Sequence, residues 1–125
     1  MNLLCFNKSL RLLSSSDYKA VFDNALLKVS SPQVLFLARP NGRDYPRLGL
    51  VVAKKNAKLA VQRNRIKRIT RETFRLQQHQ LGGIDTIVLA RAGLDKLDNS
   101  DMQQLLSNLW QQLKRRADKL SLDTQ

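Results

Sequence analysis

Apolar residues follow two different spacings along the chain, and each spacing predicts one kind of element. A short amphipathic helix is predicted where apolar side chains recur at i, i+3, i+4 and i+7: Tyr18, Val21, Phe22 and Ala25. Ser14 and Asp17 indicate its start, because they stand at the spacing of a capping box. The helical spacing returns near the end of the chain, where an apolar stripe predicts a last helix: Met102, Leu105, Leu106, Leu109, Trp110 and Leu113.

Three apolar runs are predicted to be strands. They span 34–38, 48–53 and 84–90, and the last is apolar over nearly its whole length, which is typical of a strand buried on both faces. Asn41 and Gly42, after Pro40, form a strong turn signal, so we expect the first two strands to pair as a hairpin. A helix separates the second and third strands, and we therefore expect these two to be parallel.

The long helix between those strands is predicted to run from about residue 57 to about residue 80. Gly82 and Gly83 follow it, and glycine readily adopts the left-handed conformation found after many helices. Ser100 and Gln103 form a second capping box before the last helix. Trp110 is assigned to the core, because its neighbours on the stripe are leucines. The polar segment 119–125 is predicted to fray.

The predicted order of elements is helix, strand, strand, helix, strand, helix. This order belongs to the α/β class and indicates a small two-layer sandwich, in which helices cover one or both faces of a sheet. The chain has 125 residues, which suits a single domain spanning 1–125 and is too short for two domains of ordinary size.

The charge of the chain points to a partner. Its 22 basic residues outnumber the 10 acidic ones, so the net charge is +12 and the pI is near 10.6, and we expect a polyanion as partner. Residues 54–75 hold nine basic residues and one acid, Glu72, which accounts for +8 of the net charge.

A helical wheel separates the long helix into two arcs. The apolar and small residues share one arc: Leu59, Ile66, Ile69, Thr70, Thr73 and Leu76. The opposite arc is polar and strongly basic: Asn64, Lys67, Arg68, Arg71 and Arg75, with Arg63 and Arg65 on its flanks. Like charges at these spacings destabilise a free helix, so this pattern favours a bound polyanion over a merely solvated face. Arginine binds phosphates and stacks on bases, which favours RNA over a membrane surface.

Several other classes of site are excluded or disfavoured. The single Cys5 excludes an internal disulfide and a cysteine-cluster zinc site, and the single His79 excludes a site with two histidine ligands. Asp95, Asp98 and Asp101 are attributed to a loop and a helix start rather than to a metal site. No arrangement of nucleophile and base, or of paired carboxylates, stands out for catalysis. No apolar run is long enough for a signal peptide or a membrane span, so we expect a cytoplasmic protein without a membrane partner.

The basic helix also resembles that of a known family. The stretch Arg63-Asn64-Arg65-Ile66-Lys67-Arg68, continued by 71–75, is similar to the central motif of the bacterial ribonuclease P protein subunit. The resemblance extends over the segments 10–12, 17–22, 47–55 and 85–91, and it covers residues 8–115. It implies an α/β sandwich in which the long helix makes a left-handed β-α-β crossover, whereas general rules predict a right-handed one.

The resemblance further implies a function. The chain would be the partner of a catalytic RNA that removes the 5′ leader from precursor tRNA by Mg²⁺-dependent hydrolysis. The Mg²⁺ would be held mainly by the RNA, one protein would serve one RNA, and the protein alone would be inactive. The residues implied to bind the catalytic RNA are Arg63, Asn64, Arg65, Lys67, Arg68, Arg71 and Arg75. Those implied to bind the leader are Tyr18, Phe22, Phe36, Lys54, Lys55 and Arg91.

Alternatives remain open at this point. Tyr18 and Phe22 have the spacing of an ordinary core stripe, and Phe36 has the surroundings of an ordinary core strand. Position 18 is tyrosine where phenylalanine is common in the family, which keeps a stacking face and adds a hydroxyl. A structural RNA-binding protein, such as a small ribosomal protein, is the alternative function. A helix-turn-helix DNA binder is disfavoured, because no short helix and turn precede the basic helix.

Overall fold

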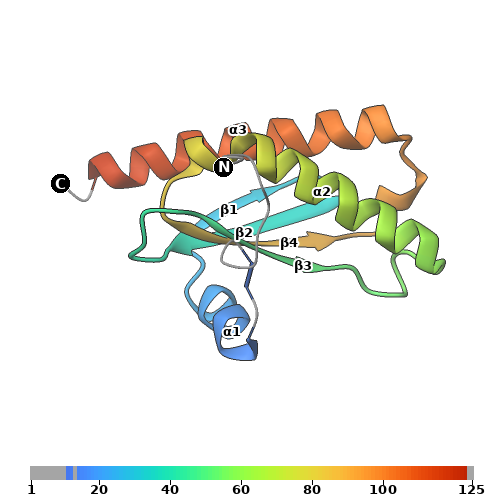
Figure 1. The fold of residues 1–125 in the computed structure, drawn as a ribbon, viewed down its shortest axis with the longest axis horizontal. Helices are drawn as coiled ribbons and strands as arrows, with labels where there is room; N and C mark the ends of the chain where they lie inside the picture. The colour runs from blue at the N-terminus through green and yellow to red at the C-terminus, as the bar shows by residue number, and fades with distance from the viewer. Residues whose placement is uncertain (1–10, 13, 124–125) are drawn as a thin grey trace, which may run out of the picture.

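The structure is a computed structural model that describes residues 11–12 and 14–123. Its elements, in chain order, are α1 (Ser15–Asp23), β1 (Leu27–Ser30), β2 (Val34–Pro40), β3 (Arg47–Val51), α2 (Ala60–Leu81), β4 (Ile84–Ala90), the 3-10 helix η2 (Leu94–Lys96) and α3 (Asn99–Asp123). The strands form one sheet in the order β1-β2-β4-β3. Helices α2 and α3 lie side by side over one face of this sheet, and α1 lies against the other (Figure 1). The α/β class is confirmed, and α1 adds a partial third layer.

The pairing of the strands differs from the prediction in one respect. β3 and β4 are parallel neighbours, as predicted, and α2 connects them. The predicted hairpin between β2 and β3 is wrong, because β4 lies between these strands and pairs with both. The left hand of the β3-α2-β4 connection, which the resemblance implies, stays a prediction.

The true hairpin partner of β2 is β1, a strand that the sequence analysis missed. β1 is only four residues long, and Leu27 and Val29 are buried while Lys28 and Ser30 are exposed. The side chain of Ser31 accepts hydrogen bonds from the backbone N–H groups of residues 33 and 34, which closes the tight turn. The turn predicted at Asn41 and Gly42 does not join β2 and β3 into a hairpin. The backbone N–H of Asn41 instead donates to the carbonyl of Gly83, 3.0 Å away, just before the start of β4.

The main core lies between the sheet and helices α2 and α3. Phe36 of β2 meets Trp110 of α3 edge to face, with ring centroids 4.5 Å apart, and both residues are fully buried. The Trp110 indole N–H donates to the hydroxyl of Thr73 on α2, at 3.0 Å. Trp110 is therefore a core residue, as predicted, and it joins the two helices to the sheet.

A smaller cluster holds α1 to the opposite face. Val21 and Ile87 are fully buried there, and Leu12 is nearly so. Alternate residues of one strand point to opposite faces, so β4 supplies Val88 to the main core and Ile87 to this cluster.

The starts of α1 and α3 test the two predicted capping boxes. The capping box of α1 is confirmed, since the Ser14 hydroxyl accepts from the Asp17 N–H at 3.1 Å. The box at Ser100 is wrong, because α3 begins earlier and the Asp98 carboxylate accepts from the N–H of Asp101 at 2.7 Å. Residues 119–123 belong to α3, so the polar segment is helical as far as residue 123, and its fraying stays a prediction. Residues 124–125 lie outside the described residues.

Candidate nucleic-acid interface

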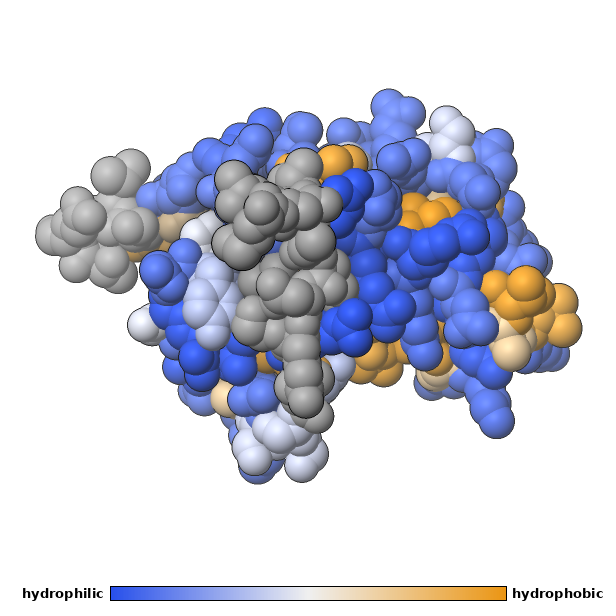
Figure 2. Space-filling view, in the orientation of Figure 1, coloured by the Kyte–Doolittle hydropathy of each residue, from blue (hydrophilic) through white to orange (hydrophobic). Residues whose placement is uncertain are grey.

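Helix α2 presents a basic face because its other face is anchored in the core. The buried residues of α2 include Ile66, Thr70, Thr73 and Phe74. The Thr70 hydroxyl donates a hydrogen bond to the carbonyl of Ile66, 2.7 Å away. The opposite side of the helix is thereby fixed toward solvent. Figure 2 shows mainly hydrophilic surface over this helix.

Three of the predicted RNA-binding residues are exposed on this side: Asn64, Arg68 and Arg71. Within residues 11–12 and 14–120, neither Arg68 nor Arg71 has a hydrogen-bond or ion-pair partner. Both guanidinium groups are therefore available to an external anion, and they provide the paired N–H donors that phosphate oxygens accept.

Arg63 and Arg65 have internal partners as well as charge. Arg65 donates to Gln62 Oε1, to Asn99 Oδ1 and to the carbonyl of Asp95, each at 2.8 Å. Arg63 donates to the carbonyls of Ala57 and Lys58, which shapes the turn before α2. These two residues hold the N-terminal end of the interface in place, a role that the helical wheel could not show because most of their acceptors lie outside α2.

Arg75, near the other end of the basic face, forms an ion pair with Glu72. The guanidinium of Arg75 approaches Glu72 to 2.5 Å, and Glu72 is the single acid of segment 54–75. This hydrogen bond lowers the pKa of Glu72 below its ordinary value. The cationic character of the face is consequently strongest around Asn64, Arg68 and Arg71.

The helical wheel was wrong for Leu59 and Leu76, which it placed on the buried arc. Their exposed fractions are 62% and 48%, respectively. Leu59 precedes the first residue of α2, where the chain has not yet entered the helix, and its side chain does not follow the helical spacing.

A small hollow beside the edge strand β3 brings the two predicted sets of binding residues together. It has a volume of about 150 Å³, and its lining includes Tyr18 from the leader set and Lys67 and Arg71 from the RNA set. Arg11 is a third cation in the lining, and it was not among the predicted site residues. Its only sequence signal was its position in the motif 10–12, and it reaches the hollow because it bridges to Leu48 of β3.

Tyr18 has a defined place in this hollow. Its hydroxyl accepts a hydrogen bond from the backbone N–H of Leu50 at 3.2 Å, on the free edge of β3. Its ring covers Gly49, where a Cβ atom would lie 2.8 Å from the ring carbons. The hydroxyl thus protects an edge-strand donor, and Gly49 provides the space that the ring occupies.

Phe22 lies one turn further along α1 and remains 46% exposed. Its neighbour Val21 is fully buried, so the helix is held by Val21 while the Phe22 ring stays accessible. The two aromatic residues are therefore not equivalent, and Phe22 is the freer of the two.

Phe36 does not belong to this surface, and its assignment to the leader cleft is wrong. Its exposed fraction is 0%, and it packs on Trp110 on the face of the sheet that α2 and α3 cover. The adjacent Leu37 points the other way and packs in the α1 cluster.

The predicted cations Lys54, Lys55 and Arg91 do gather at one end of the sheet. They follow the C-terminal ends of β3 and β4, which are parallel, and the Asn56 side chain ties the 54–56 turn to the carbonyl of Ala90 at 2.9 Å. Lys54 and Lys55 are exposed. Arg91 is half-buried and donates to the carbonyl of Ser31, so it also holds the β1–β2 turn.

Helix α1 packs across the opposite end of the sheet, away from these cations. Asp17 lies 3.6 Å from Arg47 at the start of β3, and Arg39 at the end of β2 donates to the carbonyl of Ala20. The sheet face between the aromatics and the cations is lined by partly buried apolar residues that the sequence analysis did not identify: Leu37, Val51 and Leu89.

An ion-pair network fixes this placement of α1. Arg47 binds Asp85 with two hydrogen bonds of 2.8 and 2.7 Å, and Asn41 donates to the same carboxylate at 2.9 Å. The hydrogen bonds with Asp85 raise the pKa of Arg47 above its ordinary value. Because Asp17 adjoins Tyr18, the network connects the sheet to the part of α1 that holds the aromatic residues Tyr18 and Phe22.

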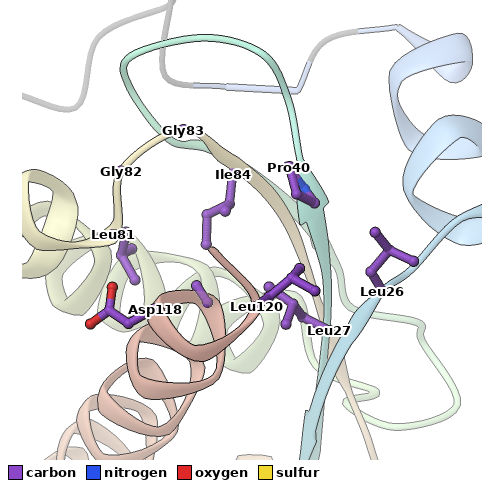
Figure 3. A pocket seen from close by; sticks show the side chains of 10 residues that line it. Leu26, Leu27, Pro40, Leu81, Gly82, Gly83, Ile84, Asp118 and Leu120 are labelled. Carbon is purple, nitrogen blue, oxygen red and sulfur yellow. The ribbon is translucent and has the colours of Figure 1, made fainter. Parts of the chain in front are cut away.

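The described residues also bear on two other kinds of site, a metal site and an apolar groove. Among residues 11–12 and 14–123 no three metal-ligating side chains converge. An apolar groove of about 400 Å³ lies at the end of the sheet where β4 begins, between Leu26, Pro40, Ile84 and Leu120 (Figure 3). Among the described residues that line it, Asp118, an acid, is the charged one.

The chain is similar to proteins of one family. A family model described as ribonuclease P matches residues 6–114. The ribonuclease P protein component of Pseudomonas aeruginosa (strain LESB58) is 52% identical over 110 residues, which are 88% of this chain and 82% of the relative. That of Acinetobacter baylyi is 47% identical over 119 residues, which are 95% of this chain and 91% of the relative.

The fold is similar as well. The RNase P protein from Thermotoga maritima superimposes with a TM-score of 0.71 and 34% identity, covering 84% of this chain and 96% of that one.

Within the described residues, no helix combines the length and the apolar character that crossing a membrane requires.

Proposed function

The chain belongs to the ribonuclease P protein family, whose members act with an RNA, and we propose that it holds the catalytic RNA on α2 and the 5′ leader of precursor tRNA on the α1 face. One protein would serve one RNA, in the cytoplasm. The RNA would carry out the hydrolysis that frees the mature 5′ end. The protein would contribute binding and orientation.

The hollow at β3 is the observation that carries this proposal. Tyr18 lines it from the aromatic side, and Lys67 and Arg71 line it from the basic helix. An RNA backbone that crosses this edge of the sheet meets both surfaces without a break. A single strand can stack its bases on accessible rings while its phosphates pair with cations, and this mode of binding tolerates any sequence.

The basic face of α2 supplies the main contact with the catalytic RNA. Arg68 and Arg71 project from one side of a helix whose other side is buried, so their positions are fixed before the RNA arrives. Such preorganisation lowers the entropic cost of binding. Arg65 braces α2 against η2 and α3, and Asn64 and Lys67 extend the same surface.

The leader would run from Phe22 across the partly buried apolar patch of the sheet toward Lys54, Lys55 and Arg91. This path replaces the cleft that included Phe36. It places a stacking ring at one end, an apolar floor in the middle and exposed ammonium groups at the other end. The floor fits the faces of unstacked bases, and the lysines fit the phosphates that follow.

The Mg²⁺ of the reaction is assigned to the RNA. Three of the carboxylates have other partners: Asp85 binds Arg47, Asp98 caps α3 and Glu72 pairs with Arg75. Among the described residues, no three acidic, histidine or cysteine side chains come together, so the proposal gives the protein no metal ligand. We derive no step of the hydrolysis through a metal on the protein.

The proposal is tested by reconstitution. Purified protein is added to ribonuclease P RNA, and cleavage of precursor tRNA is measured at low Mg²⁺, with each component alone as a control. The protein should raise the rate of RNA-dependent cleavage. An Arg68→Gln, Arg71→Gln double variant should raise it less. A wild-type protein that leaves the rate unchanged would refute the proposal, and a structural ribosomal protein would behave in that way.

A further inference from the structure

Two large apolar side chains are exposed at the beginning of helix α2. Leu59 precedes the helix and Val61 lies in its first turn, and their exposed fractions are 62% and 68%. Figure 2 shows hydrophobic surface at the end of the molecule where α2 begins, next to hydrophilic surface. We call Leu59 and Val61 the apolar patch.

The apolar patch continues the line of the basic face. Arg68 follows Val61 by seven residues, which is two helical turns, so both side chains point to the same side of α2, about 10 Å apart along the axis. Asn64 lies between them on that side. A partner that lies along Arg71, Arg68 and Asn64 therefore reaches the patch at its end.

The charges around the patch are positive. Lys58 adjoins Leu59 and is exposed. The Arg63 guanidinium donates hydrogen bonds to the carbonyls of residues 57 and 58, which keeps its charge close to Leu59. The segment 54–71 contains no acid. Acidic residues occur around the start of α3, where Arg65 donates to the carbonyl of Asp95 on a flank of α2.

This combination specifies the chemistry of the occupant. Exposed aliphatic side chains gain free energy when a flat, apolar surface covers them, while the surrounding cations favour a polyanion. An unstacked nucleobase joined to phosphates has both properties. We propose that the apolar patch receives an unpaired base of the RNA partner whose backbone lies on the basic face, which deepens the proposed function and rests on it.

The same helix offers a matched control. Leu76 is also an exposed leucine, at 48%, but it lies near the C-terminal end of α2, and Glu72 precedes it by one turn. The apolar groove at the start of β4 is a second contrast, because the charged residue in its described lining is the acid Asp118. The cation next to Leu76 is Arg75, whose charge is paired with Glu72, so neither site has the unpaired positive surroundings of the patch.

The experiment compares the affinity for ribonuclease P RNA across a series of salt concentrations. The test variant is Leu59→Gln with Val61→Gln, and the control is Leu76→Gln; glutamine is a good helix former and leaves the charge unchanged. The test variant should bind about ten-fold more weakly at every salt concentration, with the wild-type salt slope. The control should bind like wild type. Circular dichroism and thermal unfolding verify that each variant is folded.

Base-specific chemical probing of the RNA supplies a second measurement. Wild-type protein should protect a small number of unpaired bases that become reactive again in the complex with the test variant. Unchanged affinity and protection would overturn this inference while wild-type binding upholds the proposed function. A changed salt slope, or an equal loss in the control, would overturn it too. Failure of the wild-type protein to bind the RNA would refute the proposed function itself.

Discussion

Phe22 and Phe36 offer the sharpest test of the proposed leader path, because the structure places them in opposite surroundings. Phe22 is 46% exposed on α1, and Phe36 is fully buried against Trp110. Phe22→Ala removes an accessible stacking face and little of the core. Stacking on an aromatic side chain contributes about 1–3 kcal/mol per base, so precursor tRNA should bind the holoenzyme about 5-fold to 150-fold more weakly.

Phe36→Ala should act on stability instead. Truncating a fully buried phenylalanine costs about 3–5 kcal/mol. For a domain of this size the melting temperature falls by about 4 °C per kcal/mol, so the midpoint should fall by about 12–20 °C. Phe22→Ala should shift it by no more than a few degrees, since its ring is half exposed.

The assay measures binding of precursor and mature tRNA to the reconstituted holoenzyme, with thermal unfolding of each free protein. Mature tRNA has no leader, so Phe22→Ala should leave its affinity unchanged. Equal losses for precursor and mature tRNA would show that Phe22 does not meet the leader. A folded, stable Phe36→Ala protein with a selective loss for precursor tRNA would refute the placement of Phe36 in the core.

Three further outcomes are expected. Replacing Arg68 and Arg71 by glutamine should reduce the slope of log affinity against log salt by about 0.7–0.9 for each phosphate that the variant no longer neutralises, measured by binding titrations; an unchanged slope would mean that both side chains are merely solvated. Asp85→Ala should lower the free energy of unfolding by about 3–5 kcal/mol in denaturant titrations, because it removes the carboxylate that accepts both hydrogen bonds from the half-buried Arg47; a decrease below about 1 kcal/mol would contradict the importance of this pair. Nuclease-free protein without RNA should release no leader from precursor tRNA, and specific cleavage by the protein alone would overturn the assignment of catalysis to the RNA.

Much of the interface was accessible from the sequence because it lies on one helix. A helix fixes the relative directions of its side chains through a constant rotation per residue, so residues 60–81 reveal a basic side without any tertiary information. The exposed positions of Asn64, Arg68 and Arg71 follow from this. The internal bonds of Arg65 do not, because Asn99 and Asp95 are about thirty residues away in sequence and only folding brings them close.

The aromatic surface depended more on tertiary structure. Side chains of a strand alternate between the two faces, but the run 34–38 is apolar at every position, so its pattern does not tell which residues face α1. Phe36 and Leu37 differ by one position and lie on opposite faces. The sequence also could not place α1 at the end of the sheet where β3 begins, since that depends on the contact of Asp17 with Arg47.

The sequence by itself determined the long helices, the buried strand β4, the parallel pairing of β3 with β4 and the concentration of cations on α2. These features arise from local periodicity and from the length of the connecting helix, which a linear pattern contains. Only the tertiary structure decided that β4 separates β2 from β3, that Tyr18 meets Lys67 and Arg71 in one hollow, and that Phe36 is core. Such contacts join distant segments, and their free energy depends on which surfaces are buried together rather than on the spacing of residues along the chain.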